Sequence, residues 1–357
     1  MMKRLLRTWV GTGCRATALL ARNERRTQHG LTVLCYHRIL PEANKQSYFY
    51  RDAVVTPESF RHQCITLKRY YEVLPLHEAV EVLSTRRASD RPIATITFDD
   101  GYQDNYCYAQ PILASLELRA TFFVIAGLVG TDEAPWYDRL ARAAHTLQQQ
   151  DLERIVRDTA GPIADKERVN QNHNEASTCR LLVELAKAMS PRERKRLLAR
   201  LSGSTPDQTP VPATDLIMDW GQLVALGEAG HEIGSHGLTH ELLTLLDDLA
   251  LETEVVESRR LLEEKTGQPV RSFCYPNGDV DDRVARVVTS AGYQNAVTTE
   301  VGLNEPTTDR LRLRRRFIHE GRLTGFAHRP SATLLRMELC GLSSRLFRRH
   351  EPGPHQI

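Results

Sequence analysis

The stretch IATITFDDG, residues 93–101, contains a predicted buried strand that ends in two acids. Its first six residues are apolar or β-branched, which is typical of a strand with both faces covered. Asp99 and Asp100 follow at the carboxyl end of this strand, where β/α folds carry their functional groups. Successive strand residues point to opposite faces, so both acids can enter one site only where the chain turns, and Gly101 permits that turn.

Two carboxylates buried side by side are costly unless a cation or a proton offsets their charge. A metal ion would hold one of them as a ligand and lower its pKa, which would leave the other to act as a base. The alternative is that Asp100 only caps the helix that follows it. The pair therefore predicts a metal site with an adjacent base.

Strands of the same kind alternate with helical segments on both sides of this stretch. The expected strands are residues 31–39, 120–127, 231–236, 270–278 and 293–299, and the expected helices are residues 56–71, 111–118, 219–230, 249–265 and 280–292. Thr56 and Asp219 are expected as N-caps. This alternation predicts a mainly parallel sheet with crossover helices. A β/α barrel fits best, and a doubly wound open sheet is the alternative, although no Gly-x-Gly-x-x-Gly supports a dinucleotide site.

The chain divides into three parts by composition. Residues 31–330 form the predicted barrel, and within them residues 138–212 are charged and poor in strand signals, which predicts a helical insertion with a capping box at Ser190. Residues 1–30 and 331–357 are predicted as basic tails. Such tails can bind an anionic membrane surface, although solvated ends that bind nothing are the simpler alternative.

Composition limits the class of protein. The 357 residues are 41% hydrophobic and 26% charged, which is typical of a soluble globular protein, and a net charge of +2 gives no argument for a nucleic-acid partner. Seven cysteines without a Cys-x-x-Cys pair favour a reducing cytoplasm. Gly11, Gly13 and Arg15 interrupt the first apolar segment, so we expect no export signal and place the protein in the cytoplasm or at the inner face of a membrane. The sequence predicts no particular oligomeric state.

Two histidines follow the predicted strand HEIGSH. His236 and His240 are four residues apart, and with one carboxylate they form a two-histidine, one-carboxylate set that leaves positions open for water and substrate. His231 and Glu232 resemble the start of a zincin motif, but the second histidine comes one residue too late and the segment is predicted as a strand. No Gly-x-Ser-x-Gly elbow indicates a serine hydrolase.

Four motifs then occur in a fixed order: TFDDGY, ATFFV, the segment from Asp219-Trp220 through GHEIGSH to the second histidine, and FCYPNG. Together they resemble the polysaccharide deacetylase family, which is carbohydrate esterase family four or the NodB-homology group. VLCYHRI and WYDRL resemble members from exopolysaccharide gene clusters in particular. The resemblance covers residues 31–329 and implies an α/β fold, a distorted (β/α) barrel of the NodB-homology type.

The resemblance also implies roles for individual residues. Asp99 would be the base, and a divalent ion, Zn²⁺ or else Co²⁺ or Ni²⁺, would be held by Asp100, His236 and His240. A backbone N–H near Tyr275 would hold the oxyanion. The residues expected to contact substrate are Tyr102, Trp220, Pro276 and Asn277. The implied reaction is hydrolysis of an N-acetyl group on an amino sugar, in a polysaccharide or a lipid-linked glycan precursor, with release of acetate.

The chain departs from the family pattern in three places. Gly237 stands where the family often has Ser or Thr, and Cys274 stands where an arginine orients the base. We expect Arg315 to replace that arginine from another strand. The third departure is in the late motif, which supplies a histidine as general acid in the family and is matched only loosely here, with His319 as the nearest candidate. The first two departures favour an alternative, a weakly active or inactive glycan-binding protein, and an O-acetyl esterase is a further alternative.

Overall fold

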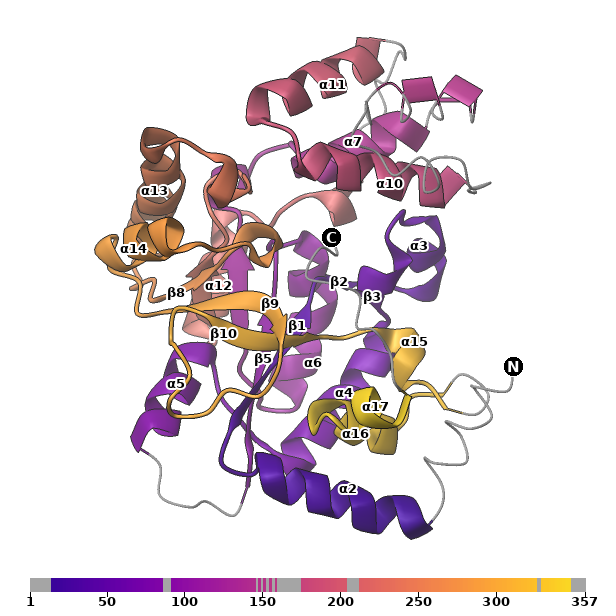
Figure 1. Ribbon diagram of the computed structural model, residues 1–357, viewed down its shortest axis with the longest axis vertical. Coiled ribbons are helices and arrows are strands. Elements are labelled where there is room, and N and C mark those ends of the chain that lie inside the picture. Colours follow the sequence, from indigo (N-terminus) through magenta and orange to yellow (C-terminus); the bar gives the residue numbers. More distant parts are fainter. Residues whose placement is uncertain are drawn as a thin grey trace.

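A closed barrel of seven parallel strands forms the centre of the molecule. The computed structural model describes residues 14–85, 91–145, 175–203, 212–325 and 329–347, with seven further residues between 147 and 158. Strands follow one another around the barrel in the order β1, β10, β9, β8, β7, β6, β5, and β5 pairs with β1 to close it (Figure 1). Their bounds are Leu31–Tyr36 for β1, Ile93–Phe98 for β5, Thr121–Val124 for β6, Glu232–Ser235 for β7, Ser272–Cys274 for β8, Asn295–Val301 for β9 and Leu313–Phe317 for β10. The predicted β/α barrel is confirmed.

Side-chain alternation along the strands separates the barrel interior from its outer layer. Leu31 and Val33 of β1 pack with Ile93 of β5 and Leu313 of β10 inside the barrel, and α5 (Leu76–Thr85) adds its apolar face to the same cluster. The intervening residues of each strand pack against the outer helices. The inward rows continue to Cys35, Thr97 and Asp99 at the carboxyl ends of β1 and β5, so polar groups occupy that end of the interior.

The crossover helices begin at the caps that the sequence predicts. Thr56 Oγ1 accepts the Ser59 N–H at the start of α4, and Asp219 forms a capping box with Gln222 at the start of α12. The bounds are Pro57–Tyr70 for α4, Gln110–Ser115 for α6, Trp220–Glu228 for α12, Asp248–Thr266 for α13 and Asp282–Ser290 for α14. Shorter elements are β2 (Arg38–Ile39), α3 (Glu42–Ser47), β3 (Val54–Val55), β4 (Glu72–Val73) and α15 (Glu320–Leu323).

Three helices between β6 and α12 lie together at one end of the barrel (Figure 1). They are α7 (Trp136–His145), α10 (Glu175–Lys187) and α11 (Pro191–Gly203). Ser190 and Glu193 bond reciprocally at the start of α11, as the predicted capping box requires. These helices fall in the segment that we predicted as a helical insertion.

The two ends of the chain contain helices that pack together, where the sequence suggested only basic tails. Leu20 of α2 (Cys14–Thr27) is buried against Leu334 and Met337 of α16 (Ala332–Leu339). Arg336 donates twice to the Glu24 carboxylate, at 2.7 Å each. The last helix is α17 (Leu342–Phe347). The sequence did not predict this contact, because both segments are rich in basic residues and their few apolar residues lie at opposite ends of the chain. Among the described residues, no helix combines the length and apolar character needed to cross a bilayer.

Candidate metal centre and active site

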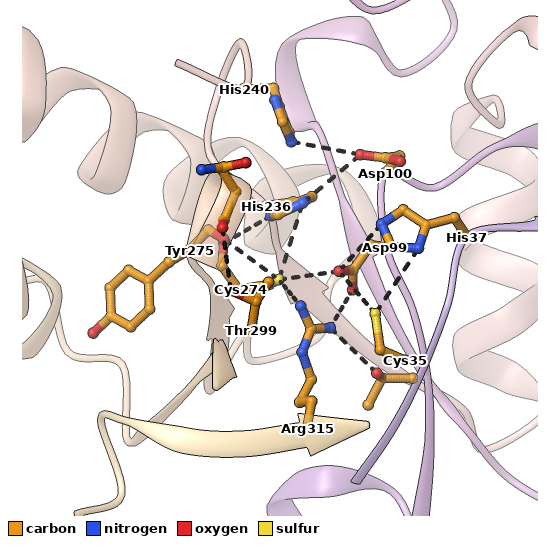
Figure 2. A network of polar contacts seen from close by, with 12 residues as sticks. Cys35, His37, Asp99, Asp100, His236, His240, Cys274, Tyr275, Thr299 and Arg315 are labelled. Carbon is orange, nitrogen blue, oxygen red and sulfur yellow. Dashed lines mark hydrogen bonds and ion pairs between the residues drawn. The ribbon is translucent and has the colours of Figure 1, made fainter. Parts of the chain in front are cut away.

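Asp100, His236 and His240 meet at the carboxyl ends of β5 and β7 (Figure 2). Asp100 Oδ1 lies 3.7 Å from His236 Nε2 and 3.6 Å from His240 Nε2. All three side chains are buried. The structure therefore brings together the three residues that the resemblance assigns to the metal.

Unusual backbone geometry places two of these three side chains. Asp100 has φ 68° and His240 has φ 63°, in the left-handed region that non-glycine residues seldom occupy. Gly101, which follows Asp100, has φ 82°, and Gly237, which follows His236, has φ 79°. Each non-glycine residue in this region costs on the order of 1–3 kcal/mol, and such strain is typical of functional sites. The first turn lets Asp99 and Asp100 enter one site from a single strand end.

Contacts behind the metal ligands fix their orientation. His236 Nδ1 lies 2.7 Å from the Cys274 carbonyl oxygen, which can only accept, so Nδ1 carries the proton and the Nε2 lone pair faces Asp100. Trp136 Nε1 donates to the His240 carbonyl oxygen at 3.1 Å. Glu254 of α13 accepts the Leu238 N–H at 2.9 Å and also binds Thr239, so it holds the loop between the two histidines.

Gly237 is explained by the same loop. Its φ of 79° strains any other residue, and a Cβ there would lie 3.1 Å from Glu254 Oε2. The Gly237 N–H donates to Ser235 Oγ at 3.2 Å. Because Glu254 and Ser235 hold the loop, the side-chain hydroxyl that the family often has at position 237 is not needed for that purpose.

The three donor atoms fit a divalent ion. Two ligands about 2.1 Å from an ion at tetrahedral angles lie roughly 3.4 Å apart, close to the observed separations. Burial, followed by the charge of Asp99, raises the pKa of Asp100 well above its usual range, so its carboxylate needs a cation. Burial lowers the pKa of His236 and of His240, which keeps both imidazoles neutral and able to ligate.

Asp99 lies beside this group and is held by Arg315 of β10. Arg315 donates to Asp99 Oδ1 at 2.6 Å, and its Nε donates to the Thr298 carbonyl oxygen at 2.9 Å. Burial opposes ionisation of Asp99, but the Arg315 guanidinium, together with His236 and His37, outweighs it and holds the pKa of this carboxyl well below its usual range. Arg315 thus makes the contact that we expected of an arginine replacing the one missing at position 274.

The second oxygen of Asp99 faces weaker donors. The thiols of Cys35 and Cys274 each lie 3.5 Å from Asp99 Oδ2, and His37 Nε2 lies 3.8 Å from it (Figure 2). Arg315 also lies 3.3 Å from Cys274 Sγ. Asp99 therefore presents one tightly bound oxygen and one oxygen with weak partners.

One pocket exposes this arrangement to solvent. Among the predicted site residues, its lining includes Asp99, His236, His240, Tyr275, Asn277 and Arg315. The lining also includes residues that the sequence analysis did not assign, namely Cys35, His37, Trp136, Tyr137, Lys187, Leu242, Gly278, Thr299 and Phe317.

Five predicted residues lie outside the pocket lining: Asp100, whose carboxylate faces His236 and His240, and Tyr102, Trp220, Pro276 and His319. Tyr102 is buried, and its hydroxyl donates to Asp138 Oδ2 at 2.8 Å, so it belongs to the layer behind the site. Trp220 packs against the turn at Gly130, and Pro276 packs beside Gly237. The His319 ring contacts the Phe317 ring at a tilted angle, with ring centroids 4.4 Å apart, but His319 does not reach the lining. Trp136, Tyr137, Tyr275 and Phe317 are the tryptophan, tyrosine and phenylalanine residues that line the pocket.

Tyr275 lines the pocket, but its polar groups are already bound. Its N–H donates to the Val297 carbonyl oxygen at 3.2 Å, and its hydroxyl donates to the Leu311 carbonyl oxygen at 3.0 Å. The next turn residue, Asn277, has φ 60° and also lines the pocket. An oxyanion donor in this turn would therefore come from Asn277 and not from Tyr275.

His37 is the most important residue that the sequence analysis missed. It follows β1 as Asp99 follows β5, and β1 pairs with β5 in register from Leu31 to Tyr36. The rule that assigned Asp99 to the site, a polar residue after a buried strand, applies equally to the histidine of VLCYHRI. Lys187 offered no such signal, because it belongs to a helix far from the barrel strands in sequence.

The family that the sequence matches agrees with the geometry of this site. A sequence profile described as polysaccharide deacetylase matches residues 86–174 and 200–296, which is more than half of the 357-residue chain. The chain belongs to the polysaccharide deacetylase family. That family is metal-dependent, in agreement with the Asp100, His236 and His240 group.

Individual relatives are distant. The "Putative polysaccharide deacetylase YxkH" of Bacillus subtilis is 21% identical over 232 residues, which cover 65% of this chain and 53% of the relative. The chain thus spans about half the length of that relative. A peptidoglycan-N-acetylglucosamine deacetylase of Bacillus cereus is 31% identical over 68 residues, 19% of this chain and 32% of the relative.

Solved deacetylase structures share the fold. The Streptococcus pyogenes deacetylase PplD, in complex with acetate, has a TM-score of 0.56 at 18% identity and covers 87% of this chain and 98% of its own. IcaB from Ammonifex degensii has a TM-score of 0.53 at 18% identity and covers 86% and 97%. These two likenesses show that the chain shares its barrel fold with PplD and IcaB.

Proposed function

We propose that the protein hydrolyses N-acetyl groups on an amino sugar of a polysaccharide or a lipid-linked glycan precursor, and releases acetate. The observation that carries this proposal is a buried two-histidine, one-carboxylate group with a second carboxylate, Asp99, beside it that is not among the three ligands. The relatives named above are deacetylases of glycans, which supports the same class of substrate.

Asp100, His236 and His240 would hold the divalent ion, with Zn²⁺ as our first expectation. A divalent ion there supplies Lewis-acid polarisation of the acetyl carbonyl and lowers the pKa of a water molecule. Neutral imidazoles and one carboxylate suit Zn²⁺, Co²⁺ and Ni²⁺ alike.

Asp99 acts as the general base in this proposal. Arg315 fixes its Oδ1 atom, so Oδ2, which has only weak partners, is the oxygen that takes the proton of water. His37 lies beside Asp99 Oδ2 and lines the pocket, and burial lowers its pKa to about 3, so it is neutral before the reaction. It then takes the proton that Asp99 has removed from water and passes it to the departing sugar nitrogen, which leaves Asp99 and His37 in their starting states. His37 takes the acid role that we expected of His319, which does not line the pocket.

The decisive experiment separates catalysis from metal binding. Asp99→Asn removes the base and leaves the three ligands intact, so acetate release from N-acetylated oligosaccharides should fall at least ~100-fold while zinc content, measured by elemental analysis, stays near one ion per chain. The exposed Asp132→Asn variant is the matched control and should keep the normal rate.

Near-normal turnover in Asp99→Asn would contradict the mechanism. Bound metal with no release from any acetylated glycan would instead support the glycan-binding alternative. Assaying O-acetyl esters beside N-acetyl amides tests the esterase alternative, since the amide substrate needs a proton donor for its leaving group far more than the ester does.

A further inference from the structure

Helix α10 presents a row of charged side chains toward the site. Arg180, Glu184 and Lys187 are spaced by four and three residues, so they lie on one face of the helix. Lys187 at the end of α10 lines the same pocket as Asp99 and His240. Helix α10 therefore adds an ammonium group to a pocket that is otherwise built from the barrel strands, their loops and the start of α7.

The Lys187 ammonium is unusually enclosed. The residue is 7% exposed, and burial lowers the pKa of its amine. Its Nζ lies 3.0 Å from Glu184 Oε1, and this is the ion pair of Lys187 within the described residues. An ammonium has three donors, so Glu184 can satisfy one while the others remain for a group inside the pocket. A lysine is seldom buried unless it is paired or binds a ligand.

The other charged groups at the site have partners of opposite charge. Arg315 is bound to Asp99, and Asp100 would be matched by the metal ion. Glu184 is 28% exposed at its side chain and so offsets the Lys187 charge only partly. Lys187 is thus the cation of the lining that is most available to a substrate.

The row of positive charge continues away from the pocket. Arg180 lies over the Tyr50 ring at 4.6 Å and is 3.9 Å from the largely exposed Asp52. Arg322 of α15 lies in the same region, because the charges of both Arg322 and Arg180 act on the His319 imidazole and on the Tyr50 hydroxyl. Together, Lys187, Arg180 and Arg322 form what we call the cationic rim.

We propose that the cationic rim binds an anionic group of the substrate, a carboxylate or a phosphate, next to the sugar that is deacetylated. This inference rests on the proposed function and specifies its substrate class. The shared chemistry is an anionic oxygen that accepts hydrogen bonds from Lys187 and Arg180. A uronic acid neighbour and a sugar diphosphate are the two sources of such a group.

Three probes distinguish the sources. Chitotetraose is neutral, a hyaluronan tetrasaccharide carries carboxylates beside N-acetylglucosamine, and UDP-N-acetylglucosamine carries a diphosphate. With the zinc-loaded full chain, we expect kcat/KM for acetate release to be at least tenfold higher on one anionic probe than on chitotetraose. Lys187→Gln should reduce that preference below threefold, mainly through KM, and Lys187→Arg should restore most of it.

Two further variants distinguish a specific effect of the cationic rim from a general effect of removing a positive charge. Arg180→Gln changes a half-buried residue of the rim and should reduce the same preference more weakly. Lys195→Gln removes an equal charge from the exposed side of α11 and should leave the preference unchanged. Equal rates of the wild type on neutral and anionic probes would overturn the inference. An equal loss on all probes in Lys187→Gln would do the same.

A binding measurement separates this inference from the proposed function. Calorimetric titration of the three probes into the zinc-loaded Asp99→Asn protein reports binding without turnover. Selective binding of an anionic probe that is lost in Lys187→Gln supports the cationic rim. If no probe releases acetate from the wild type, that failure counts against the proposed function and leaves the evidence for the cationic rim intact. Binding without anion preference overturns the rim whether or not acetate is released.

Discussion

Arg315 and Asp99 form a buried ion pair whose two members come from strands that are separated in sequence but meet in the barrel. Both side chains are at most 3% exposed. Removing one partner of such a pair leaves an uncompensated buried charge, which typically costs about 3–5 kcal/mol.

Arg315→Gln should therefore lower the free energy of unfolding by about 3–5 kcal/mol and abolish most turnover. The double variant Arg315→Gln, Asp99→Asn should recover part of the stability but no activity, because it removes the unpaired charge and the base together. Urea denaturation checks the first effect and acetate release the second. Arg314→Gln, at the exposed neighbouring residue, is the control, and equal destabilisation at both positions would contradict the argument.

Protonation of His231 makes the stability of the fold depend on pH. It is buried, its Nδ1 accepts the Ala120 N–H at 3.1 Å, and burial lowers its pKa to about 4 from an ordinary value of 6.5. The unfolded chain therefore binds a proton at higher pH than the folded chain does. The stability that His231 contributes is present above pH 6.5 and is lost as the pH falls toward 4.

Between pH 7 and pH 5, this one group should lower the free energy of unfolding by about 2 kcal/mol. His231→Gln should flatten the pH dependence by that amount, whatever its effect on stability at pH 7. Urea denaturation at several pH values measures the difference. His29→Gln, at an exposed histidine, should leave the profile unchanged, and an unchanged profile in His231→Gln would refute the assignment.

At the scale of elements, α11 supports the loop that carries His240. Arg194 of α11 is buried, forms an ion pair with Glu241 and lies over the Trp136 ring at 4.8 Å. Trp136 in turn donates to the His240 carbonyl oxygen. The inserted helices thus brace a metal ligand from behind.

Arg194→Met keeps the side-chain volume but breaks the ion pair with Glu241. Zinc affinity should fall by about 10-fold or more, as is usual when a group supporting a metal ligand is lost. Competition with a chelator, followed by calorimetry, measures this change. The exposed Arg192→Met variant is the control, and equal affinities in the two proteins would show that α11 does not brace the loop.

The elements also show what the sequence could predict. Asp100 was found because it follows an apolar strand and precedes Gly101. His236 and His240 were found from their spacing of four residues after the predicted strand HEIGSH, and the family resemblance joined the three as ligands. β10 was not among the expected strands because three consecutive arginines interrupt the apolar pattern of LRRRF. Arg315 itself was expected to orient the base from another strand, and the barrel shows that this strand is β10, next to β1. Lys187 was missed because helical spacing says nothing about which pocket a helix covers. Local patterns identify strand ends, whereas partners from distant elements need the fold.

At the scale of the whole molecule, the two chain ends form one packed unit. Leu20→Ala should lower the free energy of unfolding by about 2–3 kcal/mol, because it leaves a cavity between α2 and α16. Leu19→Ala, at the neighbouring residue that is 40% exposed, should cost much less. Urea denaturation compares the two, and similar losses would show that the contact between the ends does not stabilise the fold.

The ends also bear on where the protein acts. Arg22, Arg25 and Arg26 of α2 are exposed, so the basic character predicted for residues 1–30 lies in part on a packed helix. We keep the proposal of weak, salt-sensitive binding to an anionic membrane surface. Flotation with phosphatidylserine vesicles at low salt measures it, and the absence of binding would remove the proposal.

Helix α2 has a further consequence for synthesis. Among the described residues, its buried Leu20 clusters with α16 and the start of α17, which leave the ribosome after nearly the entire barrel. At roughly 5–20 residues per second, the wait is roughly 15–60 s. During that interval, an amphipathic basic helix has an uncovered apolar face, so the nascent chain should be a client for chaperones that hold such helices until translation ends.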